Sequence, residues 1–292
     1  MPRLKSRVQI PFPAPNENRK GRPAKPALFL CLVPALGLLP EIHTAMGVFV
    51  DTAIALDAPL DELLDAARCR YDVCFEPVAV GDTRLELLQI ADVAALIDRQ
   101  LAAAGDGPVE LPYWAAVWPG AVLLAHGLPG LGDPAGRSAL EVGCGIGVAG
   151  LFAAAAGYDT LLTDIHPDAL LFTQINILHN GLAHRAKVAR ADFTADRLGR
   201  RFDAILGAEV LYMQDAYRGL MKFLLAHIAL KKDAAVLLAK DYTRKATRFL
   251  AMADEEFAIA ERVVGFKETN PESGQPERKL CQLYRLTPKK VA

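Results

Sequence analysis

The 292-residue sequence lacks the signatures of several common protein classes. Its five cysteines are too few for a disulfide scaffold in a chain of this length. Neither a C-x-x-C pair nor an H-E-x-x-H segment occurs, so we expect no metal site. Lys and Arg number 33 against 34 Asp and Glu, and this balance lacks the basic excess of a protein held by nucleic-acid phosphates. Apolar residues, at 52%, predict a globular chain with a substantial core.

The amino terminus lacks a segment long enough to span a membrane. Residues 1–26 are basic and proline-rich, and the uncharged run at 27–39 is shorter than the span of about 20 residues that a bilayer needs. We treat residues 1–56 as an extension with three interpretations: an ill-ordered or artefactual stretch before a true start at Met46, a targeting segment, or an ordered helix packed on the domain. The cofactor inferred below is made in the cytosol, so a cytoplasmic location is expected.

Residues 57–107 predict a small α+β subdomain. A short amphipathic helix is expected at 60–68, and strands at 71–80 and 84–90 flank the turn dipeptide Gly81-Asp82, which is typical of a β-hairpin. Residues 91–103 have a helical composition, and the Gly-Asp-Gly-Pro run at 105–108 ends that helix.

Residues 108–292 predict a second, larger α/β domain. Strands at 138–143, 160–164, 187–190, 202–208 and 234–240 alternate with helices, a pattern typical of a parallel sheet with helices on both faces. Two late strands at 258–266 and 280–286 predict an antiparallel hairpin at the edge of the sheet. Seven strands distinguish this fold from the plain dinucleotide-binding fold.

A glycine-rich turn follows the first of these strands, in the segment LEVGCGIG at 140–147. Glycines let the backbone turn sharply and approach a ligand, but such a run alone is weak support for a binding site. Three acids give it context. Glu141 suits a cationic or amino-bearing ligand, Asp164 ends the second strand where an acid can hold a ribose diol, and Asp192-Phe193 can bracket an adenine. A ligand with an adenosine and a positive charge but no phosphate is S-adenosylmethionine.

Taken together, these motifs resemble the class I, seven-strand methyltransferases with a Rossmann-like sheet. More narrowly, the segment PYWAAVWPG at 112–120 and the Glu-x-x-Tyr segment at 209–212 resemble methyltransferase family 16. That family includes protein-lysine methyltransferases, among them the enzyme acting on the electron-transfer flavoprotein β subunit. The resemblance covers about residues 84–286. The sequence departs from the pattern at Ile146, where Thr is common, and at Glu209, where Asp is common.

The resemblance implies an S-adenosylmethionine-dependent transfer of a methyl group to a protein lysine, without a metal. The implied cofactor-binding residues are Trp118, Glu141, Gly143, Cys144, Gly145, Asp164, Asp192 and Phe193. Two further residues, Glu209 and Tyr212, would stand where the methyl group moves, and Glu209 could orient the acceptor amine. We expect a protein acceptor, no stable nucleic-acid binding and no membrane span.

Purely structural interpretations of these residues also stay open at this point. Trp114 and Trp118 are four residues apart and could be core residues on one helix face, and Tyr212 could be a half-buried aromatic at a strand end. The segment at 240–242 could line an acceptor pocket or lie on the surface. The histidines show no ligand spacing and are interpreted as solvated or locally hydrogen-bonded.

Rival functions also stay open. A nucleic-acid amino-methyltransferase would show an Asn/Asp-Pro-Pro-Tyr/Phe segment where this chain has Glu-Val-Leu-Tyr. A small-molecule methyltransferase leaves no signature in a single sequence. A non-catalytic module that keeps the fold as an interaction scaffold is opposed by the intact glycine turn and Asp164.

Overall fold

The computed structural model describes residues 55–104, 111–269 and 275–291. The interpretations offered for the first 54 residues therefore lie outside the described residues. The helices are α1 (Leu60–Arg70), α2 (Val93–Ala104), α3 (Pro119–Gly127), α4 (Val148–Ala156), α5 (Pro167–His179), α6 (Tyr217–His227) and α7 (Thr247–Glu256), with short 3₁₀ segments η1 (Tyr113–Ala115), η2 (Leu128–Leu131) and η3 (Gln214–Ala216). The strands are β1 (Val73–Val80), β2 (Thr83–Ile90), β3 (Ser138–Val142), β4 (Asp159–Asp164), β5 (Ala186–Arg190), β6 (Ala204–Ala208), β7 (Ala235–Asp241), β8 (Phe257–Thr269) and β9 (Pro276–Pro288).

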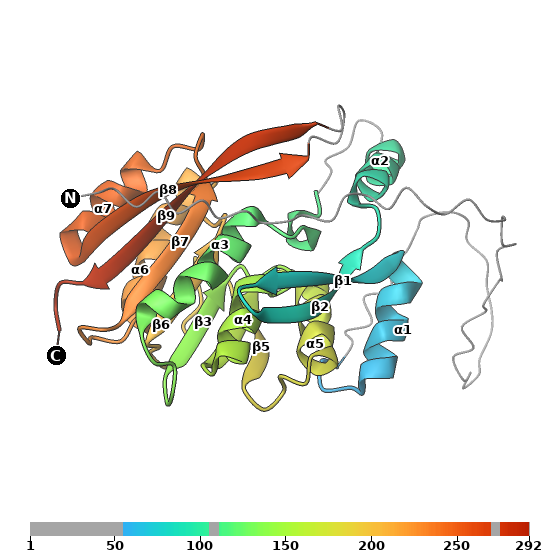
Figure 1. The fold of residues 1–292 in the computed structure, drawn as a ribbon, viewed down its shortest axis with the longest axis horizontal. Helices are drawn as coiled ribbons and strands as arrows, with labels where there is room; N and C mark the ends of the chain where they lie inside the picture. Colours follow the sequence, from blue (N-terminus) through green and yellow to red (C-terminus); the bar gives the residue numbers. More distant parts are fainter. Residues whose placement is uncertain (1–54, 105–110, 270–274, 292) are drawn as a thin grey trace, which may run out of the picture.

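The seven-stranded sheet confirms the predicted fold class. Its order is β5-β4-β3-β6-β7-β9-β8, with parallel pairing from β5 through β7 and antiparallel pairing of β9 with both β7 and β8. The chain starts the sheet at β3, builds outward to β5 and then returns to place β6 on the other side of β3 (Figure 1). In open α/β sheets, ligands bind outside the carboxyl ends of the strands at such a switch point.

Both faces of the sheet are covered, as the alternation of side chains requires. On β3, Ala139 belongs to one apolar cluster, while Leu140 and Val142 belong to the other. The first cluster is completed by α3, α4 and α5, and the second by α6 and α7. Parallel strands buried on both faces read as continuous apolar runs, which is why these strands were visible in the sequence.

The late hairpin is longer than the sequence indicates. Only part of β9 pairs with β7, from Cys281 to Leu286, whereas β8 and β9 pair with each other from Phe257↔Pro288 to Thr269↔Pro276. The two strands therefore extend past the edge of the parallel sheet as a two-stranded arm (Figure 1). The outer part of this arm is rich in polar residues, so the pattern of apolar residues in the sequence did not indicate its full length.

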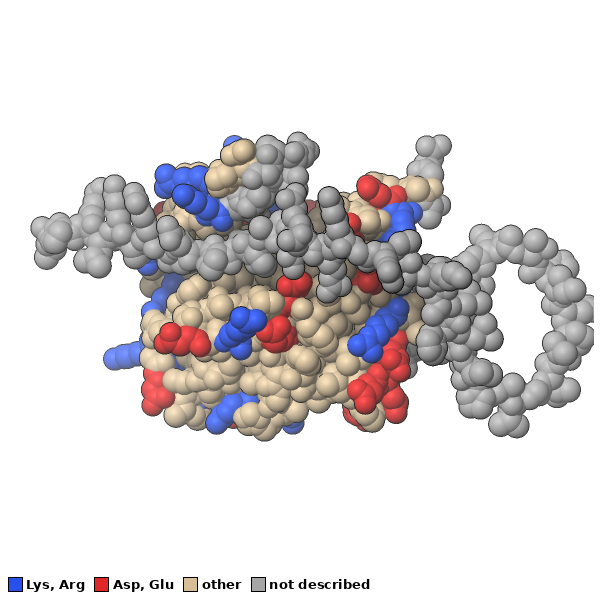
Figure 2. Space-filling view, turned by 45° about the vertical axis from the view of Figure 1, so that its right-hand side comes forward, with Lys and Arg blue, Asp and Glu red and all other residues tan. Residues whose placement is uncertain are grey.

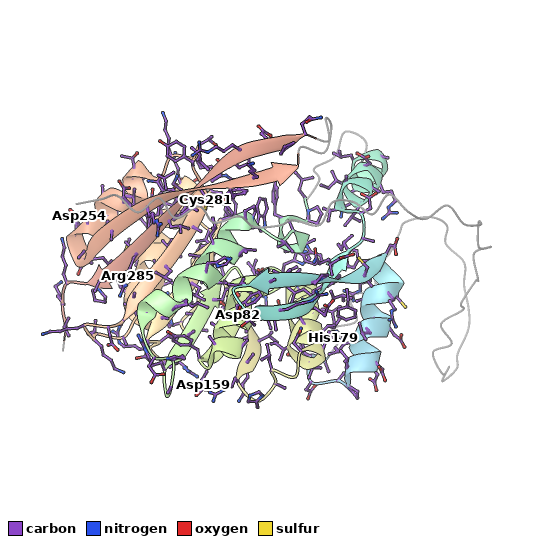
Figure 3. All side chains as sticks on the ribbon, viewed as in Figure 1. Asp82, Asp159, His179, Asp254, Cys281 and Arg285 are labelled. Atoms are coloured by element: carbon purple, nitrogen blue, oxygen red, sulfur yellow. The ribbon has the colours of Figure 1, made fainter. Side chains whose placement is uncertain are left out.

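The amino-terminal elements pack on α5. The predicted hairpin is present, with Val80↔Thr83 as the last pair before the turn. Asn176 Oδ1 accepts a hydrogen bond from Leu88 N at 2.6 Å, and the Asn180 side chain bonds both the backbone N–H and C=O of Glu86. Near the end of α5, His179 stacks on Phe75 of β1 at 3.9 Å between ring centroids (Figure 3). The division into units at 57–107 and 108–292 stays a prediction.

Charges of both signs are interspersed over the part of the surface that Figure 2 shows. None of the helices in the described part of the chain combines the length and apolar character needed to cross a lipid bilayer.

Candidate active site

A pocket of about 640 Å³ lies at the carboxyl ends of β3, β4, β5 and β6. Its size is within the range typical of small-molecule sites. All ten residues that the sequence singled out line this pocket: Trp118, Glu141, Gly143, Cys144, Gly145, Asp164, Asp192, Phe193, Glu209 and Tyr212. They come from segments up to 94 positions apart in the sequence, so the fold brings the candidates together.

The glycine-rich turn uses its backbone amides inside the protein. Gly145 N donates to Asp164 Oδ2 at 2.9 Å, and Cys144 N donates to Thr163 O at 3.0 Å. Gly145 has φ +55°, and a Cβ there would meet Trp114 O at 2.7 Å. Only glycine therefore allows η1 to press on the turn. Two backbone amides of the turn, those of Cys144 and Gly145, are therefore occupied by protein oxygens and do not point to a phosphate.

Asp164 and Glu141 are buried carboxylates fixed by backbone amides. Asp164 Oδ1 also accepts from His166 N at 2.9 Å, and burial raises the pKa of Asp164 above its ordinary value despite these bonds. Glu141 Oε2 accepts from Gly150 N at 2.8 Å in the first turn of α4. Burial raises the pKa of Glu141 to about 8. Both acids are held rigidly and partly deprived of solvent, which suits recognition of hydroxyl or cationic groups.

Asp192 follows β5 and is more exposed than the other two acids. Its Oδ1 accepts from Thr194 N at 2.7 Å and Thr194 Oγ1 at 2.6 Å, and these bonds hold the pKa of Asp192 below its ordinary value. Phe193 is half-buried and packs against the cluster beneath the sheet. The pair presents a fixed carboxylate beside an apolar ring on the same wall of the pocket.

Glu209 has an unusual backbone and one unsatisfied carboxylate oxygen. Within the described residues it is the one non-glycine residue with positive φ, +54°, and such strain clusters at functional sites. Its Oε2 is buried and has no hydrogen-bond partner among the described residues. Arg244 Nε lies 3.8 Å from this oxygen, too far for a hydrogen bond. Burial raises the pKa of Glu209, while Arg244 opposes that shift.

Tyr212 is 53% exposed and lines the pocket three residues after Glu209. Met213, also exposed, lines it beside Tyr212. Burial of part of the Tyr212 ring raises the pKa of its hydroxyl, and the nearby carboxylate of Asp164 adds to the shift. The β6–η3 segment thus brings one strained carboxylate and one half-exposed phenol to the pocket.

The two tryptophans are not on one helix face, so that interpretation is wrong. Trp114 is in η1, whereas Trp118 precedes α3, whose Pro119 sets the first turn. Trp118 Nε1 donates to Tyr113 O at 2.8 Å. The extended residue Ala116 separates the two into different elements, and both residues line the pocket.

Sequence reasoning missed His166 and Trp114 as site residues. Their rings stack at 5.1 Å with an interplanar angle of 22°, and both line the pocket. The His166 side chain also accepts from Asp168 N at 3.2 Å, capping α5, so the interpretation as a locally hydrogen-bonded histidine is confirmed for this residue. Its position directly after the acid-bearing strand end was the available signal.

Arg244 was also missed. It lines the pocket from the loop after β7, while Lys240 is buried and Tyr242 is exposed. Among the lining residues of the described chain, Arg244 is the one arginine or lysine, against four carboxylates. No group of three His, Cys, Asp or Glu side chains in the same described part is arranged to hold a metal.

The side chains and backbone groups that line the pocket fit S-adenosylmethionine. The pocket offers carboxylates and aromatic faces, and the glycine turn has its amides already bonded to Asp164 and Thr163. Carboxylates suit ribose hydroxyls and a cationic amino group, and aromatic rings attract a sulfonium through their π faces. A phosphate would meet four acidic side chains and a single arginine.

Comparisons with known proteins agree with this geometry. The chain is 30% identical over 158 residues to protein N-lysine methyltransferase METTL21A of Mus musculus, covering 52% of this chain and 72% of the relative. It is 34% identical over 121 residues to the electron transfer flavoprotein beta subunit lysine methyltransferase of Danio rerio, covering 40% and 45%. A crystal structure of an S-adenosylmethionine-dependent methyltransferase from Agrobacterium tumefaciens shares the fold, with TM-score 0.50, 17% identity and coverage of 77% and 80%.

The family described as lysine methyltransferase matches residues 114–256. This range includes the glycine turn, the three acid-bearing strand ends and the Glu-x-x-Tyr segment. The chain belongs to the lysine methyltransferase family, and its methyl donor is S-adenosylmethionine.

Proposed function

We propose that this protein transfers a methyl group from S-adenosylmethionine to the side-chain amine of a lysine in another protein. Two relatives named as lysine methyltransferases of protein substrates support this acceptor class. The observation that carries the proposal is Glu209, a strained residue whose buried Oε2 lacks a hydrogen-bond partner among the described residues. An arriving ammonium or amine would supply that partner.

Residues on the β3, β4 and β5 ends would hold the donor. We assign Asp164 to the ribose hydroxyls, because its two oxygens are already oriented by Gly145 N and His166 N. Glu141, with Gly143, Cys144 and Gly145, would meet the methionine part of the donor. Asp192 and Phe193 would bracket the adenine. Trp118 would pack near the sulfonium, where an aromatic face contributes about 0.5–2 kcal/mol to binding a cation.

Residues after β6 would hold the acceptor. When bound, S-adenosylmethionine would supply a sulfonium methyl carbon that a neutral amine can attack in line, the N–C bond forming as the S–C bond breaks and S-adenosylhomocysteine leaves. Glu209 would accept a hydrogen bond from the lysine Nζ and fix its direction, and orientation of this kind can supply much of a rate acceleration. The Glu209 carboxylate favours binding of the lysine as a cation, and the amine must then lose a proton to solvent before it attacks.

We also propose that the protein is cytoplasmic and that its acceptor is not a nucleic acid. The donor is made in the cytosol. The pocket lining has one arginine and four carboxylates, a balance that suits a cationic lysine better than a phosphate backbone.

The test is transfer of a labelled methyl group from S-adenosylmethionine into a cell lysate. We expect the label to be lost on protease treatment, retained on nuclease treatment, and recovered as methyllysine after acid hydrolysis. Glu209→Ala and Tyr212→Phe should each reduce incorporation. Asp254→Ala is the control, because this exposed residue lies on α7, outside the pocket lining (Figure 3). Label in nucleic acid or small molecules, or full activity of both variants, would refute the proposal.

A further inference from the structure

Lys240 is a buried lysine at the end of β7. Only 2% of the residue is exposed, although lysine is rarely buried to this extent unless its ammonium finds partners. The side chain is not among those that line the pocket. It therefore has a costly position and no direct part in the function proposed above.

The partners of this ammonium are backbone carbonyls of the next loop. Lys240 Nζ donates to Arg244 O at 2.6 Å and to Asp241 O at 3.1 Å. Asp241 Oδ1 accepts from Thr243 N at 2.8 Å and braces the same turn. The ammonium thus lies inside the loop at 241–244 and fixes the backbone at both of its ends. This bracing keeps the segment at 241–244 out of α7, which begins at Thr247.

The residue at the far end of that loop faces Glu209. Arg244 Nε stands 3.8 Å from Glu209 Oε2, which is the oxygen without a hydrogen-bond partner among the described residues. The pair is therefore an ion pair without a hydrogen bond, and its geometry depends on where the loop holds the Arg244 backbone. Glu209 N is itself anchored to Ala239 O at 2.8 Å, one residue before Lys240.

We propose that Lys240 is a positioning residue for the methyl transfer. Its ammonium holds the loop at 241–244 so that Arg244 stands beside Glu209 without bonding to it. Arg244 then provides a positive charge that keeps the carboxylate in place while leaving Oε2 able to accept a hydrogen bond from the lysine acceptor. This inference rests on the proposed function, because it assigns to Glu209 the contact with the acceptor.

The charged groups that face Glu209 decide the expected pH dependence. Arg244 and Lys240 contribute positive charge, while Asp241 and, when ionised, Cys281 of β9 contribute negative charge. Burial already raises the pKa of Glu209. Removing the Arg244 charge, or moving it away by releasing the loop, should raise that pKa further. The acid limb of the activity profile should then move to higher pH.

The experiment is a double-mutant cycle on the full-length protein, with an unmethylated preparation of a protein acceptor identified by the labelling test above. Arg244→Ala and Lys240→Met are each expected to lower kcat about tenfold, and the double variant should fall no further, because Lys240 acts through Arg244. The Kd for S-adenosylmethionine should change less than about twofold. The acid limb of the kcat profile should shift upward in all three variants. Lys231→Met is the matched control, because its ammonium pairs with Asp203 at 2.9 Å outside the pocket lining.

Each outcome is decisive. Losses that multiply in the double variant, or an unmoved acid limb, would show a structural role for Lys240 and overturn the inference. So would an unchanged kcat in Arg244→Ala, a surface variant that tests the inference even if Lys240→Met does not fold. Lys240→Gln, which keeps one amide donor, is the second variant at the buried position and should lose less activity than Lys240→Met. If the wild type methylates no protein lysine at all, the proposed function fails instead.

Discussion

The two sides of the pocket are built in opposite ways. On the β3–β5 side, which carries Glu141, Asp164 and Asp192, every one of these carboxylates accepts hydrogen bonds from nearby amides. On the β6–β7 side, Glu209 has a strained backbone and a buried oxygen without a hydrogen-bond partner among the described residues. A preorganised side suits a ligand that is always the same, and an unsatisfied side suits groups completed only during the reaction.

The largest expected effect comes from replacing one carboxylate on each side by the corresponding amide, which tests whether the two sides have different functions. Glu209→Gln should lower kcat about 100-fold, because it removes the charge that orients the acceptor amine, and should leave the Kd for S-adenosylmethionine within about twofold. Asp164→Asn should raise that Kd about 10–100-fold, because it weakens charge-assisted hydrogen bonds. Isothermal calorimetry gives the Kd, and initial rates at saturating donor give kcat.

Two exposed aspartates serve as controls for this exchange. Asp159 begins β4, the strand that Asp164 ends, and Asp254 lies on α7; Figure 3 labels both. Asp159→Asn and Asp254→Asn should leave kcat and Kd unchanged, since neither side chain lines the pocket. If Glu209→Gln weakened donor binding as much as it slowed transfer, the functional division between the two sides would be wrong.

A smaller effect tests the close packing of η1 against the glycine-rich turn on the β3–β5 side. Gly145 and Gly81 have nearly the same positive φ, +55° and +58°. An added Cβ meets Trp114 O at 2.7 Å in the first case and nothing within 4 Å in the second. Gly145→Ala should therefore lower the free energy of unfolding by about 1–3 kcal/mol more than Gly81→Ala, as measured by urea denaturation. Equal losses would show that only the backbone strain common to both positions matters.

The residues that line the β3–β5 side could be singled out from the sequence because their signals are local. Apolar runs mark buried parallel strands, and an acid in the last residues of such a strand or just after it lies near the carboxyl edge of the sheet. The glycine turn adds a conformational requirement that is visible in residue type alone. Glu141, Asp164 and Asp192 were therefore found, and the structure gathers them around one pocket.

The rest depends on contacts between distant segments. Trp114 reaches the pocket because η1 presses on Gly145, and its ring stacks on His166, 52 positions along the chain. Arg244 reaches Glu209 because Lys240 braces the intervening loop. The positive φ of Glu209 has no signal in residue type, since glutamate does not favour that region. No local pattern in one sequence records these tertiary contacts.

The last effect concerns the cost in stability of keeping Glu141 buried on the preorganised side. Its ordinary pKa is 4.5, and burial in the folded state raises it to about 8. The fold therefore favours the protonated form, and the stability associated with it is fully present below pH 4.5 and is lost as pH rises toward 8. The slope should reach at most about 1.4 kcal/mol per pH unit. Glu141→Gln cannot ionise, so its unfolding free energy should lack this decline.

Urea unfolding of both proteins at pH 5, 6, 7 and 8 measures the difference. Parallel curves would mean that Glu141 ionises in the folded protein as freely as in the unfolded chain, against the burial of its carboxylate beside α4. Saturating S-adenosylmethionine adds a further comparison. If the amino group of the donor meets Glu141, ionisation of Glu141 becomes favourable in the complex. The unfolding free energy of the wild type should then decline less steeply with pH, while that of Glu141→Gln should keep the same pH dependence as without the donor. Binding of the cationic amino group of the donor would then explain why the protein keeps Glu141 at a position where its carboxylate destabilises the free protein at neutral pH.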